Sequence, residues 1–120
     1  MNNKKTKTYE ERKKESDDIS LKYPDRVPCI IEKLTNNHDT LIPEIDKNKY
    51  LVPKDLNVGQ LMYVIRKRIK ITPEKALFIF CNGKVLQGSQ TIDTLYNSHK
   101  DKDGFLYLIY SGEATFGSSQ

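Results

Sequence analysis

A strand that leads directly into an amphipathic helix constrains the fold of this chain more than any other stretch. Residues 49–53 read Lys-Tyr-Leu-Val-Pro, an aromatic and β-branched run that ends at a proline. Residues 54–57 have the composition of a turn and helix cap, and the apolar residues of 58–70 then recur at helical spacing. The sequence therefore predicts a strand that feeds a helix packed on a sheet.

The predicted helix over 58–70 carries more apolar surface than one buried face requires. Its main stripe, at i, i+4, i+7 and i+11, consists of Val58, Met62, Ile65 and Ile69. Leu61 and Val64 lie to one side of this stripe, where we expect them to face the strand. Two interpretations stay open: a broad core face, or an open hydrophobic groove that Leu61 and Val64 line together with Tyr50 and Val52.

Three residues in and beside the strand favour the groove. They are Lys47, Lys49 and Pro53. Lysines and prolines are typical of strands whose edge is not paired within the sheet. An unpaired edge beside an apolar groove accepts an extended peptide by strand addition, so we expect a peptide site there.

The length and composition predict one globular domain that is not inserted in a membrane. The chain has 120 residues, of which 37% are hydrophobic and 30% charged. Its longest apolar run, residues 76–81, is far shorter than the roughly 20 residues of a spanning helix. No apolar segment follows Met1, so we expect no secretory signal and a cytoplasmic protein. Cys29 and Cys81 then read as reduced core thiols.

The charge is mildly basic, with a formal net charge of +4 and a pI near 9.0. Basic proteins bind nucleic acids, but no zinc, RRM or KH signature accompanies this charge. Steering towards acidic partners or anionic membranes is the alternative. The cluster Arg66, Lys67, Arg68 and Lys70 has a similar ambiguity, because it suits either the C-terminal end of a helix dipole or an acidic docking partner.

The chain divides into three parts. Residues 1–26 are predicted to comprise a mobile segment, 1–7, and a helical extension over about 9–22, which Thr8 and Glu11 begin as a capping box. This helix is largely polar, so we expect it to pack by a narrow contact onto a preformed domain. Residues 27–110 form the predicted core, and residues 111–120 a flexible tail.

The core has the element order of a β-grasp. Strands are predicted over 27–34, 49–53, 77–81 and 105–110, with helices over 58–70 and 91–99. Asn82-Gly83 suits a tight type I′ turn, and residues 35–46 are predicted to be a polar loop. We therefore predict an α+β, ubiquitin-like β-grasp: a four-stranded mixed sheet around a central helix, with an N-terminal helical extension.

No catalytic or metal-binding constellation appears in the sequence. His38 and His99 have no paired nucleophile, and there is no Gly-rich phosphate loop. Asp101 and Asp103 read as a turn. We therefore expect neither an enzyme nor a protein that binds a cofactor or metal.

Several motifs in one order give the chain a resemblance to a known family. They are Glu15, Ile19, Tyr23-Pro24-Asp25-Arg26-Val27-Pro28, Glu32-Lys33, Lys49-Tyr50-Leu51-Val52-Pro53, Val58-Gly59-Gln60, Ile65-Arg66-Lys67-Arg68, Ala76-Leu77-Phe78, Leu95-Tyr96, Asp103-Gly104-Phe105-Leu106-Tyr107 and Phe116-Gly117. The chain resembles the GABARAP-like autophagy modifiers, from about Tyr9 to Gly117.

The resemblance implies a processed tail. A cysteine protease would cut between Gly117 and Ser118, after Phe116, and ubiquitin-type activating and conjugating enzymes would join Gly117 to phosphatidylethanolamine. Glycine suits this chemistry because it lacks a Cβ that would block a narrow enzyme channel. A lipid with two acyl chains anchors a domain stably. The protein, monomeric when cytoplasmic, would then reside on autophagosomal or vacuolar/lysosomal-pathway membranes and support their expansion.

The resemblance also implies two pockets for receptors and adaptors with short aromatic-x-x-aliphatic motifs. Pocket one would comprise Glu15, Ile19, Pro28, Ile30, Lys49, Leu51 and Phe105. Pocket two would comprise Tyr50, Val52, Pro53, Leu56, Leu61, Val64 and Ile65. Basic contacts to acidic residues of the motif would come from Arg26, Lys47, Lys49 and Arg68. Two buried anchors then predict roughly micromolar affinity.

Two alternatives remain at this point. The chain could be a ubiquitin-like interaction module of vesicle trafficking that is never conjugated, although Phe116-Gly117 counts against this. A nucleic-acid binder is the third class, which we do not expect and which would show steeply salt-dependent binding. Two positions depart from the family pattern: the loop over 35–46 is longer, and Leu61 stands where an aromatic residue is common.

Overall fold

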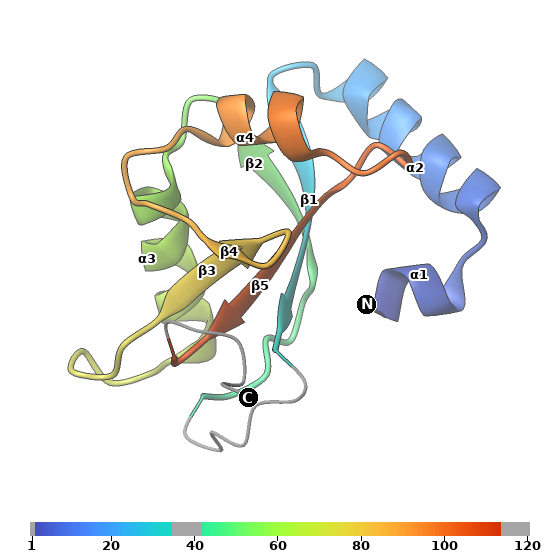
Figure 1. Cartoon of the computed structure of the whole chain (residues 1–120). Helices are drawn as coiled ribbons and strands as arrows, with labels where there is room; N and C mark the ends of the chain where they lie inside the picture. The colour runs from blue at the N-terminus through green and yellow to red at the C-terminus, as the bar shows by residue number, and fades with distance from the viewer. Residues whose placement is uncertain (1, 35–41, 114–120) are drawn as a thin grey trace.

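The computed structural model describes residues 2–34 and 42–113. The strands are β1 (Arg26–Lys33), β2 (Lys49–Pro53), β3 (Phe78–Cys81), β4 (Lys84–Val85) and β5 (Leu106–Ser111). The helices are α1 (Asn2–Thr6), α2 (Tyr9–Lys22), α3 (Val58–Ile69) and α4 (Ile92–His99). Figure 1 shows α3 on one side of the sheet and α1 and α2 on the other.

The sheet is mixed, with the order β2-β1-β5-β3-β4. β1 and β5 pair in parallel at its centre, and the other pairs are antiparallel. This confirms the predicted α+β β-grasp, with one strand more than predicted. The extra strand is the two-residue β4, which the turn at Asn82 and Gly83 folds back on β3; both turn residues have positive φ, 52° and 79°, as a type I′ turn requires.

The core lies between the sheet and α3. The inner face of β1 contributes Val27, Cys29 and Ile31, all fully buried, as their alternation predicts. The buried residues of α3 are Val58, Leu61, Ile65 and Ile69. The sequence prediction of this stripe was wrong at one position, because Leu61 is 2% exposed in the core while Met62 is only partly buried against it.

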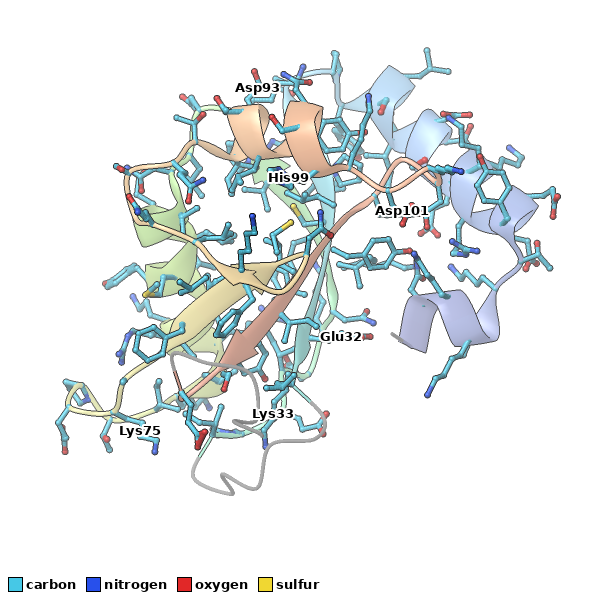
Figure 2. All side chains as sticks on the ribbon, viewed as in Figure 1. Glu32, Lys33, Lys75, Asp93, His99 and Asp101 are labelled. Carbon is cyan, nitrogen blue, oxygen red and sulfur yellow. The ribbon has the colours of Figure 1, made fainter. Side chains whose placement is uncertain are left out.

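The N-terminal segment differs from its prediction. Residues 2–6, expected to be mobile, form α1, and long-range contacts hold this helix in place. Asn3 donates from Nδ2 to the Tyr107 hydroxyl at 3.1 Å, and Lys4 Nζ lies 2.6 Å from Asp101 Oδ1. Figure 2 shows Asp101 in the turn after α4, facing the N-terminal helices. A pattern-based prediction misses such contacts because their partners lie far apart in the sequence.

α2 docks on the same turn through polar groups. Its predicted capping box at Thr8 and Glu11 is present. Arg12 Nη1 lies 2.6 Å from Oδ2 of the fully buried Asp103, and Ser16 donates to the Asp103 carbonyl. The contacts of Asn3, Lys4, Arg12 and Ser16 with residues 101–107 thus hold both N-terminal helices against this part of the domain. Asp101 and Asp103 thus stabilise a turn, as predicted.

The two cysteines are buried and free, as expected for reduced core thiols. Burial raises the pKa of both Cys29 and Cys81, which keeps the thiols protonated and unreactive. No group of three or more potential metal ligands comes together in the described residues. None of the helices over residues 2–34 and 42–113 is both long and apolar enough to cross a membrane.

Candidate functional site

β2 lies at the edge of the sheet, as Lys47, Lys49 and Pro53 predict. Its backbone bonds to β1 alternate along the strand: Ile31 N–H donates to the Asn48 carbonyl at 2.8 Å, and at the other end Lys54 N–H donates to the Asp25 carbonyl at 3.1 Å. In this antiparallel register the N–H and C=O groups of Lys49 and Leu51 point away from β1. β2 therefore presents an outward row of donors and acceptors.

Pro28 fits this register. It lies opposite Leu51, in a pair whose backbone groups turn away from each other. Its missing N–H therefore does not interrupt the ladder between β1 and β2. The same alternation fixes which side chains of β1 and β2 share a face.

The outer face of the sheet brings together five of the seven residues predicted for pocket one. Directly paired residues share a face, so Pro28 and Leu51 lie together, as do Ile30 and Lys49. Phe105 immediately precedes Leu106, which faces the core, so Phe105 lies on the outer face as well. Pro28, Ile30 and Phe105 are buried and form a floor, whereas Lys49 and Leu51 are half-buried at its rim.

α2 supplies the remaining two residues of pocket one, Glu15 and Ile19, one turn apart on the same helix face. Glu15 Oε2 accepts from Lys49 Nζ at 2.8 Å, which ties the helix to the edge strand. Lys7 Nζ also reaches Glu15, at 2.9 Å. A hollow on the surface of α2 borders this cluster and includes Glu15 and Ile19.

The three charges at the rim shift one another's pKa. Burial favours the neutral form of Glu15, but hydrogen bonds from Lys49 and Lys7 outweigh it and hold the pKa of this carboxyl below its ordinary value. Burial lowers the pKa of Lys49, and the second ammonium group of Lys7 lowers it further. Glu15 thus stays ionised between two cations.

The inner surface, predicted as pocket two, is more closed than expected. Val52, Leu61 and Ile65 are 4%, 2% and 0% exposed, so they belong to the core and do not line an open groove. For Leu61, the broad core face is therefore the correct interpretation. The other residues predicted for pocket two keep solvent-accessible surface: Tyr50, Pro53 and Leu56 are half-buried, and Val64 is 43% exposed.

Tyr50 is held beside this surface. Its ring packs against the core, and Lys47 Nζ lies 5.5 Å from the ring centroid. Its hydroxyl is the buried side-chain atom that has no hydrogen-bond partner among the described residues. Burial raises the pKa of Tyr50, so the hydroxyl stays protonated.

The basic residues predicted to contact a peptide already have partners within the protein. Arg68 Nε lies 3.0 Å from Asp46 Oδ1, and this ion pair lowers the pKa of Asp46. Arg26 Nη1 donates to the Leu51 carbonyl at 3.2 Å. Together with the pair Lys49–Glu15 and the contact of Lys47 with Tyr50, these contacts order the cations around β2.

Sequence reasoning missed two of these partners, Lys7 and Asp46. Both contacts bridge separate elements, so no periodicity marks them, and Lys7 lies in the segment predicted to be mobile. Two further groups of predicted residues lie outside the described residues: His38 of the loop, and Phe116, Gly117 and Ser118 of the processing site. His99 lies at the end of α4 (Figure 2).

Comparison with known proteins gives one consistent result. The family model described as "Autophagy protein Atg8 ubiquitin like" matches residues 11–117. Autophagy-related protein 8 of Mycosarcoma maydis is 56% identical over 110 residues, which cover 92% of this chain and 91% of the relative. Autophagy-related protein 8e of Arabidopsis thaliana is 52% identical, over 92% of this chain and 88% of the relative.

The fold is shared with a solved structure of the same family. The crystal structure of Trypanosoma brucei ATG8 superimposes with a TM-score of 0.88, at 44% identity, and 98% of each chain is covered. The residues matched by the family model include the edge strand and α3 and begin within α2. This chain belongs to the Atg8 family, the GABARAP-like, ubiquitin-like proteins of autophagy.

Proposed function

We propose that this protein is a lipid-conjugated modifier that recruits receptors and adaptors to autophagosomal membranes. In this proposal a cysteine protease cuts after Gly117, and ubiquitin-type activating and conjugating enzymes attach Gly117 to phosphatidylethanolamine. The chain is their substrate and not itself an enzyme. It is cytoplasmic and monomeric before conjugation and membrane-bound afterwards, where it supports membrane expansion.

One observation carries the recruitment half of the proposal: the outward backbone groups of Lys49 and Leu51 lie between an outer and an inner apolar surface. A peptide in extended conformation would pair with these groups as a sixth strand. An aromatic and an aliphatic side chain, three residues apart, would then contact the two surfaces. The described residues offer this arrangement beside four cations, which suits a peptide with acidic residues.

The outer surface is the more open of the two for an incoming side chain. Leu51 and Ile19 are half-buried there, while Val52, Leu61 and Ile65 of the inner surface are closed off. Binding in pocket two therefore requires β2 and α3 to separate slightly, so that Leu61 and Ile65 become the floor of a cavity. We expect peptide binding to shift the NMR resonances of residues in both elements.

The conjugation half of the proposal rests on Gly117, which lies within the span matched by the family model. The decisive experiment is the intact mass of the protein from fed and starved cells, in soluble and membrane fractions. We expect a soluble form that ends at Gly117 and a membrane form heavier by one phosphatidylethanolamine. The variant Gly117→Ala should lack the heavier form, and the control Ser119→Ala should retain it.

Two results would contradict this half of the proposal. A lipidated form of Gly117→Ala would show that the lipid is attached elsewhere. Recovery of only the full-length, soluble wild-type chain would remove the conjugation step and leave an unconjugated interaction module of vesicle trafficking.

A further inference from the structure

A charged hollow of about 450 Å³ lies between α2 and the turn that joins α4 to β5. From α2 it takes Lys13, Ser16 and Asp17, which lie on a different face of the helix from Glu15 and Ile19 of pocket one. The opposite wall includes Tyr96, Lys100 and Lys102. The hollow is therefore separate from the candidate peptide site.

Hydrogen bonds within the protein fix the shape of this hollow. The Tyr96 hydroxyl donates to the Gly104 carbonyl at 2.7 Å and so joins α4 to the turn. The Tyr9 hydroxyl donates to the Lys102 carbonyl at 3.1 Å, which joins α2 to the same turn. A hollow whose walls are already ordered loses little conformational entropy when a ligand binds.

Both carboxylates in the walls are already paired. Asp17 Oδ1 lies 2.7 Å from Lys13 Nζ, and Asp101 Oδ1 lies 2.6 Å from Lys4 Nζ. Each of these acidic groups is thus balanced by a cation from the N-terminal helices. Neither is left to balance the lysines of the turn.

Those two lysines, Lys100 and Lys102, are exposed. Within residues 2–34 and 42–113, neither forms an ion pair with a carboxylate. Lys100 Nζ lies 5.2 Å from the centroid of the Tyr96 ring, which holds this ammonium group beside the hollow. The hollow therefore has two positive charges in surplus, and it attracts an acidic ligand.

The size of the hollow favours a ligand larger than a single small anion. Its volume falls within the range of sites for drug-sized ligands, about 300–1,000 Å³. A stretch of acidic protein chain has both the bulk and the charge that such a site requires. Its carboxylates would accept hydrogen bonds from the two ammonium groups.

The position of the hollow favours a protein segment over the membrane to which the protein would be joined. The hollow lies at the start of β5, and the tail that carries Gly117 follows the other end of this strand (Figure 1). Six residues of strand separate the two ends by about 17–20 Å. A membrane joined to Gly117 would thus lie on the far side of the domain, and this step alone rests on the proposed function.

We propose that this hollow is a docking site for an acidic segment of a protein partner, bound through Lys100 and Lys102. The two ammonium groups pair with aspartate or glutamate side chains of that segment. Lys13 stays with Asp17, and Lys4 stays with Asp101. Binding here leaves the edge of β2 free.

An NMR titration of the full-length, unconjugated protein tests the site. The probe is a short peptide of alternating glutamate and glycine, and a peptide with glutamine in place of glutamate is its neutral counterpart. The wild type is compared with Lys100→Gln/Lys102→Gln and with the control Lys54→Gln/Lys84→Gln. Both double variants remove two exposed lysines, so they should stay folded and they lose the same charge, but the control lysines lie outside the hollow.

We expect the glutamate peptide to shift the amide resonances of Tyr96, Lys100 and Gly104, and the glutamine peptide to leave them in place. The affinity read from the Tyr96 and Gly104 resonances should fall about three- to tenfold in Lys100→Gln/Lys102→Gln, because two ion pairs with the peptide are lost. It should stay nearly unchanged in Lys54→Gln/Lys84→Gln.

Three results would overturn the site. The first is an absence of shifts at Tyr96, Lys100 and Gly104. The second is an equal loss of affinity in the two double variants, which would show that the peptide responds to net charge and not to the hollow. The third comes from vesicles of phosphatidylcholine and phosphatidylserine: if these perturb the three resonances and the glutamate peptide does not, the ligand is a lipid headgroup.

The same titration keeps this inference apart from the proposed function. The protein is unconjugated throughout, so no result depends on the attachment of lipid to Gly117. Resonances of Lys49 and Leu51 report separately on the candidate peptide site. A response at Lys49 and Leu51 with none at Lys100 and Gly104 overturns the hollow as a docking site and leaves the proposed function intact.

Discussion

At the residue scale, Leu51 links the edge of the sheet to the outer apolar surface. Its side chain is half-buried over Pro28, while its backbone groups point outward from β2. The neighbouring Val52 has the opposite orientation and is buried in the core. Replacement of Leu51 therefore probes ligand contact without opening a cavity in the core.

The variant Leu51→Ala should weaken peptide binding by about 1–3 kcal/mol, the usual cost of removing a central apolar contact from an interface. Isothermal titration calorimetry measures this change directly. Val85→Ala is the matched control, because Val85 is an exposed aliphatic residue on β4, at the other edge of the sheet. If Leu51→Ala binds as tightly as Val85→Ala, the peptide does not use the outer surface.

At the element scale, the docking of α2 depends on a glycine in the turn before β5. Gly104 has a φ of +90°, and a Cβ at this position would overlap the side chain of Ser16. Ser16 is the buried residue of α2, and its hydroxyl donates to the Asp103 carbonyl. The helix thus approaches the turn more closely than any residue other than glycine allows.

The variant Gly104→Ala should lose about 2–4 kcal/mol of unfolding free energy, through backbone strain and the overlap with Ser16. Gly83→Ala is the matched control. Gly83 also has a positive φ, 79°, but a Cβ there would meet no atom within 4 Å. It should lose only about 1 kcal/mol, from strain alone. If urea denaturation shows that Gly104→Ala and Gly83→Ala lose equal free energies of unfolding, the close contact of α2 with the turn does not require glycine at position 104.

The elements that carry their own local signals were predictable from the sequence. Residues 49–57 and the helix after them form as expected, because a proline, a capping asparagine and apolar spacing act within a few residues. The burial of Leu61 in place of Met62 was not predictable from spacing alone, since both lie near the edge of the apolar stripe. The position of the sheet relative to α3 decides between them.

The helix α1 and the charge pairs around the site could not be predicted for a different reason. Lys4 pairs with Asp101, and Lys7 joins Glu15 and Lys49. These polar contacts form only after distant elements have docked, and no periodic pattern marks them. The faces of β1 were predictable from alternation, whereas the grouping of Pro28 with Leu51 was implied by the family resemblance.

At the scale of the whole molecule, two tyrosines of β5 make the protein less stable at alkaline pH. Burial, with the neighbouring Asp103 carboxylate, raises the pKa of Tyr107 to about 12, and burial raises that of Tyr110 to about 12. An unfolded tyrosine has a pKa of about 10. Below about pH 10 both tyrosines are protonated in the folded and in the unfolded protein, and the stabilisation that comes from their raised pKa values is complete. It is lost as the pH rises from about 10 to about 12, because the unfolded state ionises first.

Urea denaturation at several pH values between about 9 and about 11.5 should therefore show a falling free energy of unfolding. Tyr107→Phe should be less stable at every pH, since it loses the bonds to Asn3 and Asp103, but its stability should fall less steeply. Tyr63→Phe is the control, because Tyr63 is 61% exposed on α3. Parallel curves for Tyr107→Phe and the wild type would contradict the assignment of this pH dependence to Tyr107.

The central position of β5 has a consequence for how the protein is made. β5 lies between β1 and β3, yet it follows both of them along the chain, and Cys29 near the start pairs with Leu106. A ribosome therefore releases β1 and β3 before the strand that joins them exists. Until Ser111 has been synthesised, β1 and β3 each lack a partner on the edge that β5 will occupy. We therefore expect a premature stop before β5 to yield a target for proteolysis in place of a smaller domain.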